Sequence, residues 1–344
     1  MSESVLERLR RKYASRVDWF VYTEIARGSP PEVYEAALHL YRAGGKRVRP
    51  FVVMATARML AGSEGEMYAL PYAAAVELFH NFTLIHDDIM DKDDFRRGVP
   101  TTHKVYGEAF AILAGDLAYA LSYRAISHAR NLGEKPTNLA WAFNILTEAA
   151  VRVSEGQAMD MMFEEKTVVD YHDYLKMIYL KTGALLEASA KLGVVAAAEE
   201  LDQGWMPILE AMGTYGKYVG LAFQIRDDIL GVFGDPRKTG KPRYNDLIRG
   251  KKTLLVLYAY RHAEGEAKEL IRRVLERKLT GDPEELEKVA NVIRETGALS
   301  YAEDLARRFA DEAIQIIDEI REVEDEEAAE ALKELARFVV EREK

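Results

Sequence analysis

The chain has 344 residues, and its 48% hydrophobic and 30% charged residues are typical of a folded globular protein rather than a disordered one. Its 47 basic and 57 acidic residues give a net charge of −10, which argues against nucleic acid as the main partner. The absence of cysteine excludes disulfides, thiolate metal sites and cysteine nucleophiles. No apolar signal region and no uncharged apolar stretch of about 18 residues are visible. We therefore expect a cytoplasmic protein without a membrane span.

Helical periodicity begins near the N-terminus. Apolar residues recur at helical spacing over residues 6–13. Residues 29–32, Ser-Pro-Pro-Glu, predict the start of a second helix, because proline is tolerated in the first turn. Residues 43–45, Ala-Gly-Gly, end that helix, and an apolar helical segment follows over 51–60. No runs of alternating strand residues occur, so the sequence predicts an all-α fold.

The C-terminal third has the same character. Asp282 is expected as an N-cap, with Pro283 in the first helical position and Glu285 as the third residue of a capping box. Residues 305–320 and 332–339 each place apolar side chains three or four positions apart, which predicts two amphipathic helices.

No linker rich in proline, glycine or serine divides the chain, so we expect a single domain over residues 1–344. The loops predicted at 62–66 and 234–245 are short to moderate. One chemical echo occurs: residues 84–91, LIHDDIMD, and 224–231, QIRDDILG, are both apolar helical segments with paired aspartates.

These aspartates are candidate metal ligands. Asp87 and Asp91 are four residues apart and share a helix face, where like charges are unfavourable unless a cation neutralises them. Mg²⁺ prefers oxygen ligands and is often shared between carboxylates and a substrate phosphate. Acidic pairs are often merely solvated helix ends, but two such clusters, the second at Asp227 and Asp228, favour a metal-assisted site.

Basic residues accompany both acidic clusters. Glycine-rich turns and helix starts, whose backbone N–H groups attract anions, lie beside several of them. Any one of these groups taken alone is typical of a solvated surface, whereas together they suit two polyanionic substrates. They lie at 44–50, 96–97, 181–183, 239–241 and 251–252.

At this point the sequence resembles a known family. The ordered motifs are GGKRVRP (44–50), DDIMD (87–91) followed by RRG, GQAMD (156–160), KTG (181–183), and FQIRDDILG (223–231) followed by GDPRKTGK (234–241). They are similar to those of the trans-isoprenyl diphosphate synthases, or polyprenyl synthetases, most of all the archaeal geranylgeranyl and farnesyl diphosphate synthases.

The resemblance implies a fold, a reaction and a cofactor. The fold would be a single-domain helical bundle around a deep central cavity, and the protein would form a homodimer or a higher homo-oligomer. The enzyme would join isopentenyl diphosphate to an allylic diphosphate (dimethylallyl, geranyl or farnesyl) with two to three Mg²⁺ ions per active site.

The resemblance also implies roles for individual residues. Thr182 and Gln224 would face the reacting carbon, with Lys181 beside them as a further catalytic residue. The proposed metal ligands are Asp87, Asp88, Asp91, Asp227 and Asp228. The isopentenyl diphosphate site would comprise Lys46, Arg49, His80 and Arg97. The allylic diphosphate site would comprise Arg96, Lys181, Thr182, Gln224, Lys241 and Lys251.

One position departs from the family pattern. Gly231 stands where a full second motif has its last aspartate, which weakens the case for a third protein ligand there. Asp246 is a candidate source of part of the missing charge. Asp160 fits either a cavity acid or a buried hydrogen-bonding group.

Chain length is predicted from the residues that precede the first motif. Thr83 lies one turn before Asp87 and is small, whereas Phe82 lies five residues before it, about 7.5 Å along a helix. The resemblance makes Phe82 a candidate floor for the growing chain, and its bulk favours a C20 product. A core aromatic role for Phe82 is the alternative.

Other functions remain as alternatives. A farnesyl diphosphate synthase or a bifunctional C15/C20 enzyme would keep the family and change the product. A class I terpene cyclase would need no second diphosphate site, and a non-catalytic regulatory subunit typically loses motif residues that are present here. A di-iron protein would need a second Glu-x-x-His besides Glu77–His80, and the sequence has none.

Overall fold

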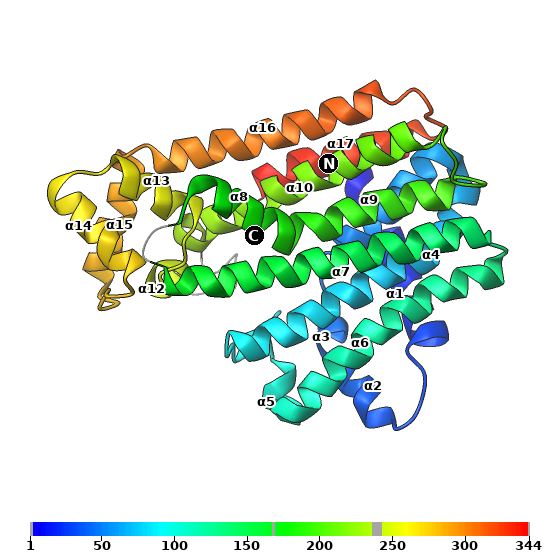
Figure 1. Cartoon of the computed structure of the whole chain (residues 1–344), viewed down its shortest axis with the longest axis horizontal. Helices are drawn as coiled ribbons and strands as arrows, with labels where there is room; N and C mark the ends of the chain where they lie inside the picture. Colours follow the sequence, from blue (N-terminus) through cyan, green and yellow to red (C-terminus); the bar gives the residue numbers. More distant parts are fainter. Residues whose placement is uncertain (1–2, 167–168, 236–242, 343–344) are drawn as a thin grey trace. The chain divides into compact units, whose positions relative to one another are not determined.

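The computed structural model describes residues 3–166, 169–235 and 243–342, and almost all of its regular structure is helical (Figure 1). The prediction of an all-α fold is confirmed. The elements in chain order are α1 (Val5–Phe20), the π-helix η1 (Val21–Ile25), α2 (Pro31–Ala37), α3 (His39–Arg42), α4 (Val48–Met90), β1 (Phe95–Arg96), β2 (Val99–Pro100), α5 (Thr102–Tyr106), α6 (Glu108–His128), the 3₁₀-helix η2 (Ala129–Leu132), α7 (Pro136–Glu165), α8 (Tyr171–Ile178), the π-helix η3 (Tyr179–Gly183), α9 (Ala184–Ala197), α10 (Met206–Phe233), α12 (Asn245–Ile248), α13 (Leu254–His262), α14 (Gly265–Leu275), α15 (Pro283–Glu295), α16 (Ala298–Glu319) and α17 (Glu326–Glu341).

Local sequence signals explain several of the helix starts. Ser4 caps α1 by accepting a hydrogen bond from the Glu7 backbone N–H, and α2 begins at Pro31 as predicted. Asp282 is the N-cap residue of α15, but its side chain makes no capping bond. Glu285 instead accepts hydrogen bonds from the backbone N–H and the hydroxyl of Thr280, which lies before the N-cap. A contact with Thr280 therefore replaces the predicted capping box with Asp282.

The first aspartate motif lies at the end of α4, a helix of 43 residues. The prediction of a loop at 62–66 is wrong. The backbone leaves helical geometry only at Ala61 and Gly62 and then continues as a helix. Gly62 has φ +57°, a conformation that costs glycine little, so two residues are enough to kink the helix.

A short hairpin after α4 was not predicted. β1 and β2 are antiparallel strands of two residues each, joined by Arg97 and Gly98. Both joining residues have positive φ, +54° and +78°, as in the two-residue turns that suit the twist of a hairpin. The sequence signal was missed because arginine replaces the usual asparagine or aspartate.

The chain divides into two compact units. Unit 1 comprises residues 1–149, 185–214 and 316–334, and unit 2 comprises 150–184, 215–315 and 335–344. Each unit is built from three separate stretches of the chain. The single domain over 1–344 stays a prediction.

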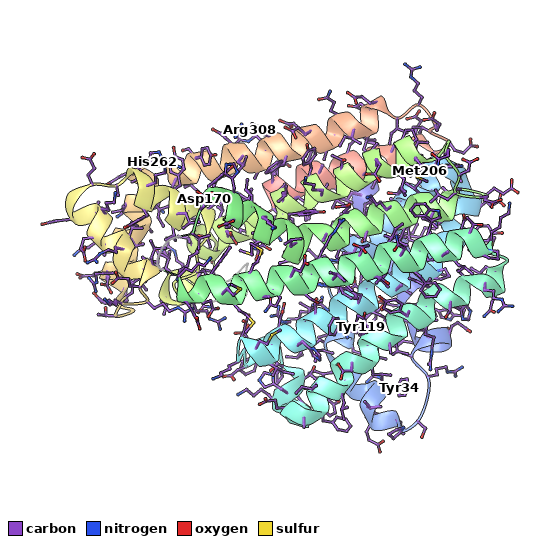
Figure 2. The ribbon with its side chains drawn as sticks, in the orientation of Figure 1. Tyr34, Tyr119, Asp170, Met206, His262 and Arg308 are labelled. Atoms are coloured by element: carbon purple, nitrogen blue, oxygen red, sulfur yellow. The ribbon has the colours of Figure 1, made fainter. Side chains whose placement is uncertain are left out.

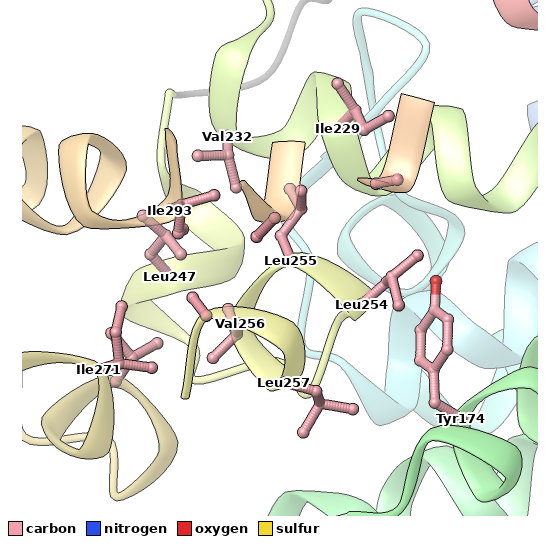
Figure 3. Close-up of a cluster of buried hydrophobic side chains, with 14 of the residues drawn as sticks. Tyr174, Ile229, Val232, Leu247, Leu254, Leu255, Val256, Leu257, Ile271 and Ile293 are labelled. Carbon is pink, nitrogen blue, oxygen red and sulfur yellow. The ribbon is translucent and has the colours of Figure 1, made fainter. Parts of the chain in front are cut away.

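The core of unit 2 is a cluster of buried aliphatic and aromatic side chains from α8, α10 and α12 to α16 (Figure 3). Tyr174 lies at its edge, beside Leu254, with its ring buried. In unit 1, α6 packs on α4 through small residues. The backbone of α6 comes so close at Gly115 that an added Cβ would lie 2.2 Å from His86 Nε2.

Among the described residues, the segment Glu108–Leu132 is long and apolar enough to cross a membrane. Nearly half of its most apolar window, 44%, is buried inside the protein. Because the core helix of a globular protein passes the same test, this packing on α4 supports the prediction that the chain has no membrane span.

Candidate active site

In unit 1, the last turn of α4 carries the first aspartate motif. Asp87 and Asp91 are partly exposed, and the Asp91 backbone N–H donates to the Asp87 carbonyl at 2.8 Å, which keeps the two carboxylates one turn apart. Asp88 is fully buried and accepts a hydrogen bond from Arg96 Nε through Oδ1. Its Oδ2 atom is buried with no partner among the described residues. Burial raises the pKa of Asp88 to about 6, although Arg96 opposes the shift.

Three basic side chains, Arg49, Arg97 and His80, lie close together on the same unit, and we call this cluster the cationic pocket. Arg49 is the central residue, because its Nε atom is buried and has no hydrogen-bond partner among the described residues. Burial lowers the pKa of Arg49 to about 10, with Glu77 opposing the shift and Arg97 adding to it. Arg49 as a whole is partly exposed, so a guanidinium with an unpaired buried Nε atom lies within reach of solvent and near a second guanidinium, an arrangement suited to bind an anion.

Arg97 and His80 complete this pocket. The Arg97 guanidinium packs on the backbone of Gly45, where an added Cβ would lie 2.9 Å from it and would displace the guanidinium. Arg97 also donates to the carbonyl of Leu40 at 3.0 Å. Burial and the neighbouring Arg49 and Arg97 lower the pKa of His80 well below its usual value, so His80 is neutral and can donate one hydrogen bond.

Arg47, a buried arginine that was not predicted as a site residue, holds the loop beside the pocket. Arg47, with φ +50°, donates to Asp18 Oδ1 at 3.0 Å, to Glu77 Oε1 at 2.9 Å and to the Tyr41 carbonyl at 2.9 Å. Glu77 is therefore committed to an ion pair, which removes it as the iron ligand of a Glu-x-x-His site. Lys46 lies in the same loop, where its carbonyl accepts from Arg10.

In unit 2, a chain of hydrogen bonds surrounds the second aspartate motif. The Tyr174 hydroxyl donates to Asp228 Oδ2 at 2.6 Å, and Gln224 Nε2 donates to Asp228 Oδ1 at 3.0 Å. The Thr182 hydroxyl donates to Gln224 Oε1 at 2.8 Å. Burial raises the pKa of Asp228 to about 7, against the effect of the hydrogen bond from Tyr174. The structure thus brings Thr182, Gln224 and Asp228 together and adds Tyr174, which sequence reasoning missed.

Asp227 has a different environment from Asp228. Its side chain is about two-fifths exposed, and its Oδ1 atom lies 3.2 Å from the guanidinium of Arg342. Arg342 is buried, donates also to the Phe223 carbonyl, and accepts hydrogen bonds from Arg226 through its own carbonyl. A signal for this contact was absent, because Arg342 lies 115 residues away in the sequence.

Lys181 and Thr182 lie on the π-helix η3. Such bulges are frequent at functional sites because they present side chains that a regular helix would not. Lys181 Nζ lies 2.6 Å from Asp160 Oδ2, so Asp160 neutralises a cation rather than adding an unpaired charge. A Cβ at Gly156 would lie 2.3 Å from the Lys181 backbone nitrogen, which explains the glycine at the start of the GQAMD motif.

Asp246 occupies the space that a side chain at position 231 would need. A Cβ on Gly231 would lie 2.2 Å from Asp246 Oδ2, and Asp246 also pairs with Lys251 at 3.5 Å. A carboxylate is therefore present beside the second motif despite the glycine. Lys241 lies outside the described residues.

Comparisons with known proteins show the family. Residues 30–293 match the family model of the polyprenyl synthetases. The chain belongs to the polyprenyl synthetase family. It is 49% identical over 314 residues to the geranylfarnesyl diphosphate synthase of Aeropyrum pernix, covering 91% of this chain and 95% of that one.

Solved structures of polyprenyl synthetases share the fold. The geranylgeranyl pyrophosphate synthetase of Pyrococcus horikoshii is 35% identical, with a TM-score of 0.87 and 98% of both chains covered. The geranylgeranyl pyrophosphate synthase of Corynebacterium glutamicum, solved with isoprenyl diphosphate and magnesium, is 28% identical with a TM-score of 0.81 and 98% of both chains covered. The protein is accordingly a short-chain prenyltransferase of the polyprenyl synthetase type.

The donor set of this polyprenyl synthetase fits a hard divalent cation. Asp87, Asp91 and the unpaired Oδ2 atom of Asp88 offer carboxylate oxygens within one helical turn. In the described parts of the chain, no group of three or more His, Asp or Glu side chains forms a protein-only metal site. Mg²⁺ usually takes one or two carboxylates and completes its ligand sphere with water and substrate phosphate, so the carboxylates of Asp87 and Asp91 are sufficient protein donors for it.

The chain-length residues lie in an aromatic cluster of unit 1. The ring of Phe82 contacts Phe79, His86 and Tyr119, with centroids 5.4, 4.9 and 5.2 Å apart, and it packs beside small residues of α2 and α6. Tyr119 is labelled on α6 in Figure 2. The Thr83 hydroxyl donates to the His80 carbonyl at 2.8 Å, so its hydrogen atom is already engaged on its own helix.

Proposed function

We propose that the enzyme condenses isopentenyl diphosphate with allylic diphosphates by head-to-tail (1′–4) elongation and makes mainly geranylgeranyl diphosphate, C20. The observation that carries this proposal is the cationic pocket of unit 1, where Arg49 has an unpaired buried Nε atom beside Arg97 and neutral His80. A terpene cyclase has no second diphosphate to hold there. The retained Asp87, Asp91 and Asp227 argue against a non-catalytic subunit.

In this proposal Arg49, His80, Arg97 and Lys46 hold isopentenyl diphosphate, whose double bond attacks the allylic carbon. The allylic diphosphate is held by Arg96, Lys181, Thr182, Gln224, Lys241 and Lys251. Two to three Mg²⁺ ions, held by the carboxylates of both motifs, supply charge neutralisation of the leaving diphosphate when they are bound.

The chemistry at carbon follows from charge. When the allylic C–O bond breaks, positive charge develops on carbon and the electron pair leaves with diphosphate. The negative ends of the Thr182 and Gln224 dipoles are suited to stabilise this charge, since they are fixed before the reaction. The isopentenyl double bond then forms the new C–C bond, and a proton leaves, with the released diphosphate as its acceptor.

An assay of elongation tests the proposal. Purified enzyme with Mg²⁺ and labelled isopentenyl diphosphate is given dimethylallyl, geranyl or farnesyl diphosphate in separate reactions, and the dephosphorylated products are sized by chromatography. We expect mainly C20 alcohol. Mainly C15, or a C15/C20 mixture, would support the farnesyl or bifunctional alternative, and mainly C25 would match the relative from Aeropyrum pernix. No elongation with any primer would contradict the proposed reaction.

The remaining expectations extend this proposal. A homodimer or higher homo-oligomer and a cytoplasmic location are proposed with it. The exposed apolar side chains on α6 support self-association, and water-soluble diphosphate substrates suit the cytoplasm.

A further inference from the structure

The two members of the second aspartate pair have separate surroundings. Asp227 is partly exposed, whereas Asp228 is buried and both of its oxygens already accept hydrogen bonds from protein groups. Mg²⁺ demands near-ideal octahedral geometry, so a carboxylate whose two oxygens are both held by buried protein donors is poorly placed to bind it. The two neighbours are therefore suited to different tasks.

Tyr174 holds Asp228 rigidly. Only about 1% of Tyr174 is exposed, and its ring packs against the aliphatic core of unit 2 (Figure 3). Its hydroxyl, at 2.6 Å from Asp228 Oδ2, forms a short bond to a carboxylate, a class of hydrogen bond that is stronger than a neutral one. The carboxylate cannot rotate without leaving the hydrogen of this buried hydroxyl without its acceptor.

The fixed carboxylate determines how the neighbouring amide is oriented. Gln224 turns its NH₂ group toward Asp228 Oδ1, which accepts the hydrogen bond, and its carbonyl oxygen away from it. That oxygen accepts the hydroxyl hydrogen of Thr182. Since the hydrogen of Thr182 is engaged in this bond, the lone pairs of Thr182 Oγ1 and Gln224 Oε1 remain available as negative ends of dipoles.

We propose that Tyr174 and Asp228 are positioning residues, which fix the Gln224 amide and the Thr182 hydroxyl with their oxygens toward the developing allylic cation, and that Asp228 is not a metal ligand. This inference rests on the proposed function, because it requires a cationic carbon at Thr182 and Gln224. A preorganised dipole acts on the transition state more than on the bound substrate. The pair is therefore expected to affect kcat and to leave substrate affinity almost unchanged.

Steady-state kinetics of Tyr174→Phe test the positioning role. We expect kcat to fall about tenfold, the effect of one lost hydrogen bond to a charged group, with both KM values within about twofold. Gln224→Leu and the double variant complete a cycle. If Tyr174 acts through Gln224, the double variant is no slower than Gln224→Leu alone. Tyr171→Phe is the matched control, because it also removes a tyrosine hydroxyl from α8. This hydroxyl accepts a hydrogen bond from Tyr301 at 3.2 Å.

Metal binding tests, without an activity assay, whether Asp228 is a metal ligand. Calorimetric titration of the full chain with Mg²⁺ in the presence of inorganic diphosphate compares Asp227→Asn with Asp228→Asn. We expect Asp227→Asn to weaken Mg²⁺ binding about tenfold and Asp228→Asn to leave the affinity within about twofold. Of these two neighbours, only Asp227 is proposed as a metal ligand. Asp228→Asn can keep its oxygen toward Gln224 and donate to Tyr174, so it should retain more activity than Asp228→Ala.

Several results would overturn the inference. Wild-type kcat in Tyr174→Phe, additive losses in the double variant, or Mg²⁺ binding weakened equally by the two asparagine variants would each do so. If Tyr174→Phe is not folded by circular dichroism, the comparison of Asp228→Asn with Asp228→Ala decides the positioning role. The wild-type reaction is measured first. Elongation by the wild type with unaffected variants refutes the positioning role alone, whereas no elongation by the wild type refutes the proposed function and this inference with it.

Discussion

At the scale of single residues, the most consequential feature is a buried ion pair beneath the cationic pocket. Arg47 and Glu77 are both at most 5% exposed, and their side chains are 2.9 Å apart. Breaking such a pair from one side leaves a buried charge uncompensated, which costs about 3–5 kcal/mol. Glu77 would then have Arg49 as its electrostatic partner, and this would draw Arg49 away from an anionic substrate.

We therefore expect Arg47→Leu to lower the free energy of unfolding by about 3–5 kcal/mol and to raise KM for isopentenyl diphosphate about tenfold. Urea denaturation and steady-state kinetics measure the two effects. Arg42→Leu is the control, because Arg42 is an exposed arginine at the end of α3. A loss of unfolding free energy no larger than in the control would contradict the anchoring role.

Phe82 carries the prediction of product length. Phe82→Ser is expected to shift the product from C20 toward longer chains, because it removes the ring that the resemblance places at the floor. The structure adds a second ring behind it, Tyr119, with centroids 5.2 Å apart. The single variant should therefore lengthen the product by about one isoprene unit, and Phe82→Ser with Tyr119→Ala by more.

Chromatography of dephosphorylated products measures both variants against the wild type. Phe110→Ala is the matched control, since Phe110 packs against the same small residues of α2 and α6 but stacks its ring on that of Tyr106. Unchanged C20 output from Phe82→Ser would refute the floor and leave Phe82 as a core aromatic.

Most site residues that the sequence predicts lie in one of the family motifs. Arg49 and Arg97 lie in such motifs, whereas His80 is assigned by the family resemblance, and the structure brings these three side chains together. Arg342 and Tyr174 carry no local signal, because their partners lie 115 and 54 residues away in the sequence. Contacts of this kind depend on tertiary packing, and neither periodicity nor charge pattern encodes them.

At the scale of elements, close backbone contact fixes the π-helix that carries Lys181 and Thr182. At Gly156 the added Cβ of Gly156→Ala would lie 2.3 Å from the Lys181 backbone nitrogen, and backbone atoms cannot move aside as a flexible side chain can. Such overpacking typically costs about 1–3 kcal/mol. We expect Gly156→Ala to lower both stability and kcat by displacing η3.

Thermal unfolding and steady-state kinetics measure this variant. Ala158→Ser, an exposed change two residues further along α7, should leave both quantities unchanged. Wild-type kcat in Gly156→Ala would show that η3 tolerates the displacement and that the contact has only a packing role.

Elements were predicted well where a helix has a strong start or a clear apolar stripe, as in α1, α2, α16 and α17. The kink at Ala61–Gly62 is shorter than the predicted loop, because a glycine indicates a break in a helix but not how many residues the break needs. The hairpin at Arg97–Gly98 was missed because its strands have only two residues each, too few for any periodicity.

At the scale of the whole molecule, α6 has a buried face of small residues and an outward face that carries apolar side chains. Ile112 is 42% exposed and Leu113 is 56% exposed. Two adjacent exposed apolar side chains on one helix mark a candidate interface, and a second copy of the chain is the partner that the resemblance implies. Stable interfaces bury about 1,600 Å² in total, so one helix face would be the centre of the contact and not all of it.

We expect Leu113→Arg to convert a homodimer to a monomer, because the cation would be buried opposite a symmetric copy of itself at an isologous interface. Light scattering coupled to size-exclusion chromatography measures the mass. Trp19→Arg is the control, since it places the same charge at an apolar side chain of α1 that is 59% exposed. A dimer that survives Leu113→Arg and dissociates with Trp19→Arg would move the interface to α1. If the wild type is already a monomer, the proposed homodimer is wrong, and the outward face of α6 requires another explanation.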